Sequence, residues 1–409
     1  MKKLLSLLPA AALLASSMPV QSVSAETDSS IEFIYEISDG SAVITGYTGS
    51  DAVLIIPDTI EDCPVEAIAG SVFMGLDELT AAVIPDSVKT IGERSFSACP
   101  NLCTVSIGSG METVGEYVFS ACPMLTSISV SDENPTFLSV EGCLCNAEGR
   151  RLLTYAGPND AVIPAGVTSI SKAAFLGKTD LTSAAVPYGV TFIGDYAFSG
   201  CTGLRYIALP DTVSQIGAGC FMSCSELETV KLGLPVKAIK DNTFNACSSL
   251  KYITITERVS SIGSHAFFGC SELSGLYIPE TVTSISETAI GQHYSIRNGA
   301  VENIAGFVVH GEEGTAVESY AESEGITFRK FICGDINDDG AIDGSDATMA
   351  LREYASVGSG YGTTLNAYGQ LAADYDLTGG IDGSDATLIL KEYARRSAYV
   401  PEIPDDAAL

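Results

Sequence analysis

Apolar residues recur through the middle of the chain with a fixed period of 23 residues. The same step separates the members of four sets: Leu204, Leu227, Leu250 and Leu273; Phe198, Phe221, Phe244 and Phe267; Cys201, Cys224, Cys247 and Cys270; and Ile193, Ile216, Ile239, Ile262 and Ile285. A repeat of 20 to 29 residues with Leu-x-x-Ile-x-Leu spacing is typical of a leucine-rich-repeat solenoid, in which each coil buries its apolar edge against the next. The pattern therefore predicts a β-rich solenoid of 23-residue repeats.

Within one coil, alternation of apolar and other residues predicts a short strand at residues 204–209. We expect Leu204, Ile207 and Leu209 to point inward and Tyr206 to point outward, because successive side chains of a strand face opposite sides. Gly217 on the return side is expected to allow a tight bend.

The period fails once, because Leu125 and Leu181 are 56 residues apart, which is two repeats plus ten residues. The extra residues lie within 131–160, where two apolar segments flank a Gly-containing turn. We expect a hairpin that projects from the solenoid wall. Its role is open, since an insertion can carry function or be only tolerated length.

Both ends of the solenoid need a cover, because an open coil would expose a sheet edge and the core. Residues 26–52 alternate apolar and polar around Ser38-Asp39-Gly40, which predicts an N-terminal hairpin cap. After Ile285 the pattern fades, and we expect a closing strand at 306–310 and a short helix at 315–323 as the C-terminal cap.

The pattern Ile-Pro-x-x-Val-x-x-Ile-Gly-x-x-x-Phe-x-x-Cys occurs at Ile84 to Cys99 and, with Leu first, at Leu209 to Cys224. With Asn134-Pro135-x-Phe137 and the closing Ala316–Ala321 segment, it makes residues 31–331 resemble the BspA-like leucine-rich repeats of bacterial secreted and surface proteins. The resemblance implies the fold, together with a role in adhesion or protein binding.

The first 25 residues resemble a secretory signal peptide: two lysines, a short apolar run and a small-residue site ending at Ala25. Removing Lys2 and Lys3 takes the formal net charge from -30 to -32. So acidic a surface disfavours nucleic-acid and membrane-surface partners. We therefore expect an extracellular protein of residues 26–409 with no membrane span after signal removal.

Twelve cysteines in a secreted chain would ordinarily suggest disulfides. Six of them occupy one repeat position, where small buried side chains stack as a ladder: Cys99, Cys122, Cys201, Cys224, Cys247 and Cys270. We favour reduced, structural thiols, although neighbouring rungs are close enough that oxidation stays open. Cys143 and Cys145 lack a second ligand pair, so zinc is not expected.

A second domain follows, at residues 332–397, with a tail at 398–409. Oxygen-bearing side chains with the spacing of a twelve-residue calcium loop occur twice, 39 residues apart, and a backbone carbonyl at loop position 7 completes each set. The predicted ligands of the two calcium ions are Asp335, Asn337, Asp339, Ala341, Asp343 and Asp346 in the first loop, and Asp374, Asp376, Thr378, Gly380, Asp382 and Asp385 in the second.

Aspartate rather than glutamate ends each loop, and near-identical helices follow at 347–355 and 386–394. These features resemble the type I dockerin, a small all-α calcium-binding domain of two related halves. The resemblance implies calcium-dependent docking to a cohesin module on the scaffoldin of a cellulosome. It places cohesin contacts at Ser345, Arg352, Ser384 and Lys391, and the likeness of the halves suggests that either can face the cohesin. Ser345 and Ser384 could instead serve only as helix caps.

No catalytic constellation is recognised. The three histidines, His265, His293 and His310, have no plausible nucleophile beside them, and no phosphate-binding glycine loop is present. Outward strand positions offer a different kind of site, because tyrosine is a good contact residue for protein or sugar. Its candidate residues are Tyr206, Tyr252 and Tyr277.

The sequence therefore predicts a secreted, non-enzymatic component of a cellulosome-like, cell-surface complex. It would dock through its dockerin and present the repeat surface to an unknown protein or to a plant cell-wall glycan, which would contribute to polysaccharide breakdown. Two alternatives stay open: a surface adhesin that binds host or neighbouring-cell protein, and an enzyme of unrecognised type.

Overall fold

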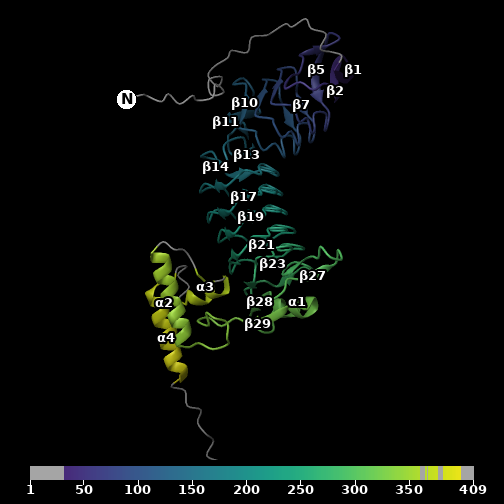
Figure 1. Ribbon diagram of the computed structural model, residues 1–409. Coiled ribbons are helices and arrows are strands. Elements are labelled where there is room, and N and C mark those ends of the chain that lie inside the picture. Colours follow the sequence, from purple (N-terminus) through teal and green to yellow (C-terminus); the bar gives the residue numbers. More distant parts are fainter. Residues whose placement is uncertain (1–31, 360–363, 366, 376–380, 398–409) are drawn as a thin grey trace, which may run out of the picture.

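The computed structural model describes residues 32–359, 364–365, 367–375 and 381–397. They form a long stack of β coils that ends in a helical module (Figure 1). The predicted signal peptide and the tail at 398–409 lie outside the described residues.

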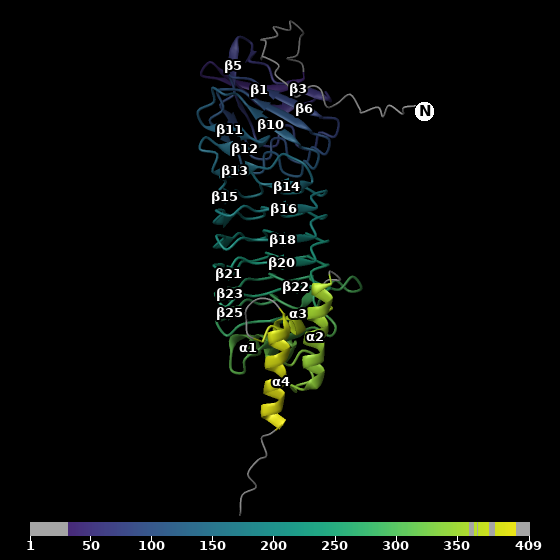
Figure 2. The ribbon, with the colours of Figure 1, turned by 90° about the vertical axis from the view of Figure 1, so that its left-hand side faces the viewer.

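The coils build parallel sheets along the sides of the stack, because each coil places its short strands beside those of the next coil (Figure 2). In the N-terminal half, one sheet runs β1 (Phe33–Ser38), β2 (Ser41–Tyr47), β5 (Cys63–Ile68), β7 (Thr90–Ile91) and β9 (Thr113–Val114), with β4 (Thr59–Ile60) paired to β5. The other runs β10 (Ser127–Val130), β8 (Thr104–Ile107), β6 (Ala81–Ile84) and β3 (Val53–Ile55).

The C-terminal half repeats this arrangement. One side holds β11 (Phe137–Val140), β12 (Cys143–Asn146), β13 (Arg151–Thr154), β15 (Ser169–Ile170), β17 (Phe192–Ile193) and β19 (Gln215–Ile216), followed by β21 (Ala238–Ile239), β23 (Ser261–Ile262) and β25 (Ser284–Ile285). The other side holds β14 (Asp160–Val162), β16 (Ser183–Ala185), β18 (Tyr206–Ala208), β20 (Thr229–Lys231) and β22 (Tyr252–Ile253), then β24 (Gly275–Tyr277), β28 (Val308–Gly311) and β29 (Thr327–Lys330).

The predicted cover at each end of the solenoid is confirmed. At the N-terminus, β1 and β2 form an antiparallel hairpin around Asp39-Gly40, and β2 pairs in parallel with β5 of the next coil. At the C-terminus, the expected strand is present as β28, but β29 and not β28 is the last strand of the sheet, and helix α1 (Ala316–Glu324) packs beside both. A second hairpin, β26 (Gln292–Tyr294) with β27 (Val301–Asn303), also belongs to this end and was not predicted.

The insertion contains the predicted hairpin, but the expectation that it projects from the wall is wrong. Strands β11, β12 and β13 pair antiparallel, and β13 then pairs in parallel with β15, so the insertion is part of the wall itself. Its strands are apolar enough to be buried, and Tyr155 at its end stacks 4.5 Å from Phe175, as the next ring in the core. The coils before and after the insertion are also bonded directly to each other, because the Ala121 N–H donates to the Leu176 carbonyl.

The repeated apolar residues form the core, as predicted. Leu204, Ile207 and Leu209 are buried while Tyr206 faces outward. The phenylalanines stack ring on ring along the solenoid axis, with centroids 5.5 Å apart on either side of Phe221. The rings form two stacks, Phe73 to Phe119 and Tyr155 to Phe267, and each stack couples its coils to their neighbours.

The cysteine ladder has a specific bonding role beyond filling space. Each thiol donates to the carbonyl of the phenylalanine 26 residues earlier, as in Cys224 to Phe198 at 3.1 Å and Cys247 to Phe221 at 3.0 Å. The same contact recurs at the other rungs, Cys99, Cys122, Cys201 and Cys270. All twelve cysteines are free thiols. Burial raises the pKa of Cys224 to about 12, so this rung is weakly reactive.

Gly217 has a different role from the one predicted. Its φ is not positive, and a Cβ there would lie 2.2 Å from the backbone nitrogen of Asp195 in the preceding coil. Close packing of consecutive coils, and not a tight bend, therefore requires glycine. Positive φ angles occur instead two residues before and two residues after the core phenylalanine, as at Asn242 and Ala246 around Phe244.

Three further helices form the C-terminal module: α2 (Gly344–Gly358), α3 (Ala367–Ala373) and α4 (Gly383–Ser397). α2 and α4 include the two helical segments expected after the calcium loops, and they pack against each other (Figure 1). Within the described residues, no helix combines the length and apolar content needed to cross a bilayer.

Candidate calcium and docking site

The first predicted calcium loop folds around its own aspartates. Asp335 accepts hydrogen bonds from the backbone N–H groups of Asp339 and Gly340, at 3.1 and 2.9 Å. Gly340, at loop position 6, has a φ of 90°, which favours glycine. Asp339 in turn accepts from the Ala341 N–H at 2.9 Å. The chain therefore turns around Asp335 as a twelve-residue cation loop turns, while Asp339 stays exposed.

Asp346 closes this loop. One of its carboxylate oxygens accepts from the Ile336 N–H at 2.7 Å and the other from the Asp343 N–H at 2.8 Å. Asp335 and Asp346 are both buried. Burial, followed by the negative charge of Asp346 and Asp339, raises the pKa of Asp335, while hydrogen bonds from the loop backbone oppose that rise.

Two buried carboxylates in one loop are the donor chemistry that a hard divalent cation would stabilise. The oxygens nevertheless bond to the loop backbone as the structure stands. In the described part of the chain, no three acidic, histidine or cysteine side chains converge as a metal cage. The residue types and the turn fit calcium, and its binding stays a prediction.

The described part of the second loop repeats the first. Asp382 N–H donates to Asp385 at 2.8 Å, and Ser384 N–H donates to Asp382 at 2.6 Å, as Asp343, Ser345 and Asp346 do in the first loop. Asp385 is buried. Of the other predicted ligands, Asp374 follows α3, while Asp376, Thr378 and Gly380 lie outside the described residues.

Asp343, and not Ser345, is the N-cap of α2. Its side chain accepts from the Ser345 N–H, and Asp346 completes a capping box. Ser345 and Arg352 on the first half, and Ser384 and Lys391 on the second, are exposed. All four predicted cohesin contacts therefore lie at the surface, and Ser345 is available for a role other than capping.

The helical module rests directly on the last coil of the solenoid. The ring centroids of Tyr277 on β24 and Phe331 are 4.4 Å apart, and those of Tyr368 on α3 and His310 on β28 are 4.1 Å apart. Asp338, inside the first predicted calcium loop, lies 3.2 Å from His310 Nε2 and also pairs with Arg329. Sequence reasoning missed this junction because its residues follow no period.

The junction changes the proposed tyrosine surface. Tyr277 is half-buried against Phe331, so its ring is not free to meet a ligand. Tyr206 is 51% exposed on β18 and Tyr252 is half-buried on β22, with Thr229 of β20 between them. The outward face therefore keeps two of the three tyrosines, one strand apart from each other.

The repeat pattern of the BspA type leucine rich repeat region matches residues 58–140 and 168–297, in 6 copies that together cover just over half of the chain. The chain belongs to the BspA-type leucine-rich repeat family. The matched copies end at residue 297, before β28 and α1. No curated protein matches the chain.

Several solved structures resemble this BspA-type chain. A leucine-rich repeat protein from Eubacterium ventriosum is 19% identical, with 66% of this chain and 91% of that one covered and a TM-score of 0.43. A leucine rich cell surface protein from Faecalibacterium prausnitzii is 21% identical over 75% and 98%, with a TM-score of 0.37. The pneumococcal vaccine antigen PcpA is 14% identical over 72% and 96%, with a TM-score of 0.44. Because these TM-scores are below 0.5, the family assignment rests on the repeat pattern.

Proposed function

We propose that this chain is a secreted, non-catalytic binding protein whose calcium-loaded module docks onto a cohesin of a scaffoldin. The repeat domain would then present its surface to another protein or to the plant cell wall, as part of a cell-surface complex.

The observation that carries the docking proposal is the duplicated surface of α2 and α4. Leu351 and Tyr354 are exposed on α2, and Leu390 and Tyr393, 39 residues later, are exposed on α4. Exposed apolar side chains grouped on a small module are characteristic of a contact site. Because the same pair occurs on both helices beside a basic residue, either helix could meet the same partner.

Calcium would act on the loops that hold these helices in place. When bound, the calcium ion would offset the negative charge of the buried Asp335 and Asp346 carboxylates. Asp346 is also part of the capping box of α2, so the loop and the helix share a residue. We therefore expect calcium to stabilise the helical pair and to be required for docking.

Capture of the full chain by an immobilised cohesin, with calcium or with a chelator, tests the proposal. We expect capture with calcium only. Substituting Ser345 and Arg352 with alanine should leave binding through the second half, and the matching change at Ser384 and Lys391 should leave binding through the first. Only the fourfold variant should lose capture. Loss in either double variant alone would contradict the use of both halves, and calcium-independent or absent capture would contradict docking.

A surface adhesin is the second candidate, favoured by the outward ring of Tyr206. It predicts attachment to host or neighbouring-cell protein that persists in chelator and weakens when Tyr206 is changed to alanine. Attachment that requires calcium would argue against this candidate.

A further inference from the structure

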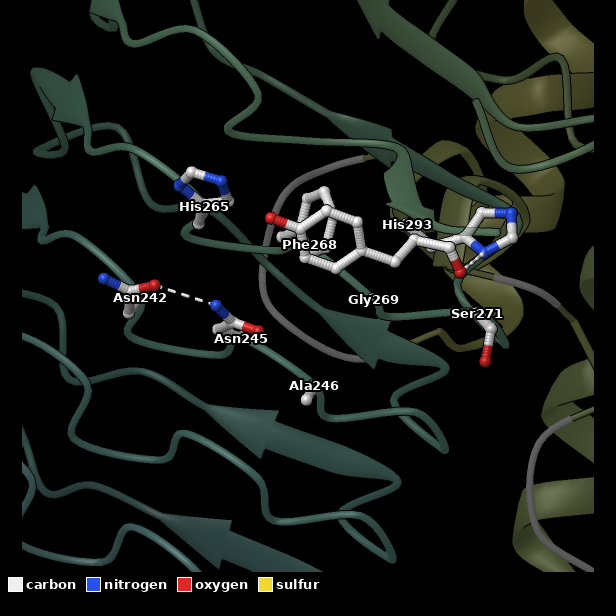
Figure 3. Close-up of a pocket in the computed structure, with 9 residues that line it drawn as sticks. Asn242, Asn245, Ala246, His265, Phe268, Gly269, Ser271 and His293 are labelled. Atoms are coloured by element: carbon white, nitrogen blue, oxygen red, sulfur yellow. Dashed lines mark hydrogen bonds between the residues drawn. The ribbon is translucent and has the colours of Figure 1, made fainter. Parts of the chain in front are cut away.

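An open pocket of about 620 Å³ lies at the turning edge of the last coils, beside the β26–β27 hairpin. In the view of Figure 3, Asn242, Asn245 and His265 lie toward one end, His293 and Ser271 toward the other, and Phe268 between them. Its remaining lining residues are Ala246, Gly269 and Tyr294. Among the described residues, neither the helical module nor Tyr206, Tyr252 and Tyr277 contribute to it.

The pocket occupies positions that the repeat leaves variable. Asn242 and His265 each lie two residues before a core phenylalanine, at φ values of 58° and 54°. Asn245 and Phe268 each follow that phenylalanine. Side chains at this edge stand outside the buried ladder, so the fold fixes their positions without fixing their identities. Their chemistry is therefore informative about a ligand.

The pocket is neutral although the chain is strongly acidic. Its lining includes no carboxylate, lysine or arginine, while the whole chain has a formal net charge of -30. Apart from His265 and His293, an anionic ligand would have no basic partner here, and a metal or ammonium ion would have no carboxylate. A neutral ligand rich in hydroxyl groups fits this lining best.

The exposed ring of Tyr294 lies beside the polar groups of the pocket. Tyr294 is 61% exposed, and its ring packs edge-to-face against buried Phe268 with centroids 4.8 Å apart. Phe268 is itself held by His265 at 5.0 Å. The Tyr294 ring is therefore supported from below, and the apolar face of a sugar ring can pack on a supported aromatic surface with little loss of entropy.

The polar groups around the ring supply both donors and acceptors. Asn245 Nδ2 donates to Asn242 Oδ1 at 2.8 Å, so the two amides hold each other in place. His293 Nδ1 lies 3.1 Å from the Tyr294 carbonyl, which makes Nδ1 the donor and leaves Nε2 as an acceptor. The small residues Ala246 and Gly269 complete the lining. A few fixed polar groups around an apolar surface are typical of a small-ligand site.

We propose that this pocket binds neutral pyranose units of a glycan. The inference does not rest on cohesin docking, and its failure would leave the docking proposal intact. Plant cell-wall polysaccharides and the neutral glycans of animal surfaces share this chemistry.

Calorimetric titration of the full chain with neutral oligosaccharides tests the proposal. One arm uses cello-, manno- and xyloglucan oligosaccharides, and the other uses neutral N-glycans and lacto-series oligosaccharides, so that the responding arm identifies the source. Oligogalacturonate serves as the anionic comparison. We expect binding in at least one neutral arm and none to oligogalacturonate. No binding in either neutral arm, or preference for the anionic sugar, would overturn the proposal.

Variants locate the site. Tyr294→Ala should raise the dissociation constant of the glycan about tenfold or more, because an aromatic contact is lost. Tyr188→Ala is the matched control, since that ring is 83% exposed elsewhere on the solenoid, and it should bind as the unaltered chain does. Ala246→Gln adds bulk to the lining of the pocket without removing a polar side chain, and should also weaken binding. Equal binding by the Tyr188 and Tyr294 variants, with no effect of Ala246→Gln, would place the glycan elsewhere.

Discussion

Removing one ring from the phenylalanine stack tests how the solenoid is held together. Phe221 is 0% exposed, and its ring lies 5.5 Å from Phe198 on one side and 5.5 Å from Phe244 on the other. Phe221→Ala leaves the backbone hydrogen bonds of the coil in place, including the carbonyl that accepts from Cys247. The substitution therefore isolates the contribution of the side chain.

The expected cost follows from burial and stacking together. Replacing a fully buried phenylalanine with alanine costs about 3–5 kcal/mol in the free energy of unfolding, because the cavity is only partly refilled. Each of the two lost stacking contacts accounts for about 0.5–1.5 kcal/mol of this. For a domain of this size, a loss of that order lowers the melting temperature by about 6–15 °C.

Phe192→Ala provides the matched control. Phe192 lies one coil earlier on β17 and is 37% exposed, so the same chemical change removes far less buried surface. We expect a cost of about 1 kcal/mol or less. The assay is thermal and urea denaturation of the full chain followed by circular dichroism. If Phe221→Ala lowers the midpoint no more than Phe192→Ala does, the stack does not stabilise the coils as we argue.

Four further outcomes are expected. Saturating calcium at about 100 times its dissociation constant should stabilise the helical module by about 2.7 kcal/mol, and Asp346→Asn should reduce that gain in a calcium titration followed by helical circular dichroism. Native protein should protect Cys247 and the other ladder thiols from alkylation, as read by mass spectrometry, because they are buried; rapid labelling would contradict the ladder. Burial lowers the pKa of Lys178 to about 8. Between about pH 8 and 10 the lysine is therefore protonated in the unfolded chain and largely deprotonated in the folded chain, so the free energy of unfolding should rise with pH. Urea titrations should show a rise on the order of 2 kcal/mol across this window relative to Lys178→Met. Asn134→Ala should cost about 2–4 kcal/mol in thermal denaturation, because the side chain bonds three carbonyls and two N–H groups; exposed Asn159→Ala, which loses no such bonds, should cost little.

The sequence predicted the helices that follow the predicted calcium loops, but not the contacts between the first loop and the solenoid. α2 and α4 begin at Gly344 and Gly383, within the last three residues of the predicted ligand patterns, because an aspartate cap and the residues after it are local signals. The contact of Asp338 with Arg329 and His310 could not be predicted in the same way. It joins the loop to two strands of a different domain, and no spacing encodes such an encounter.

The 23-residue period by itself determined the solenoid and its buried ladder. It could do so because each coil contacts only its neighbours, so that tertiary contacts repeat at the same interval as the sequence. The tertiary structure alone decided the rest. It placed the insertion within the wall, covered Tyr277 with Phe331, and brought the β26–β27 hairpin against the coil edge to form the pocket. Those contacts join segments that share no period, so their geometry depends on how the elements pack.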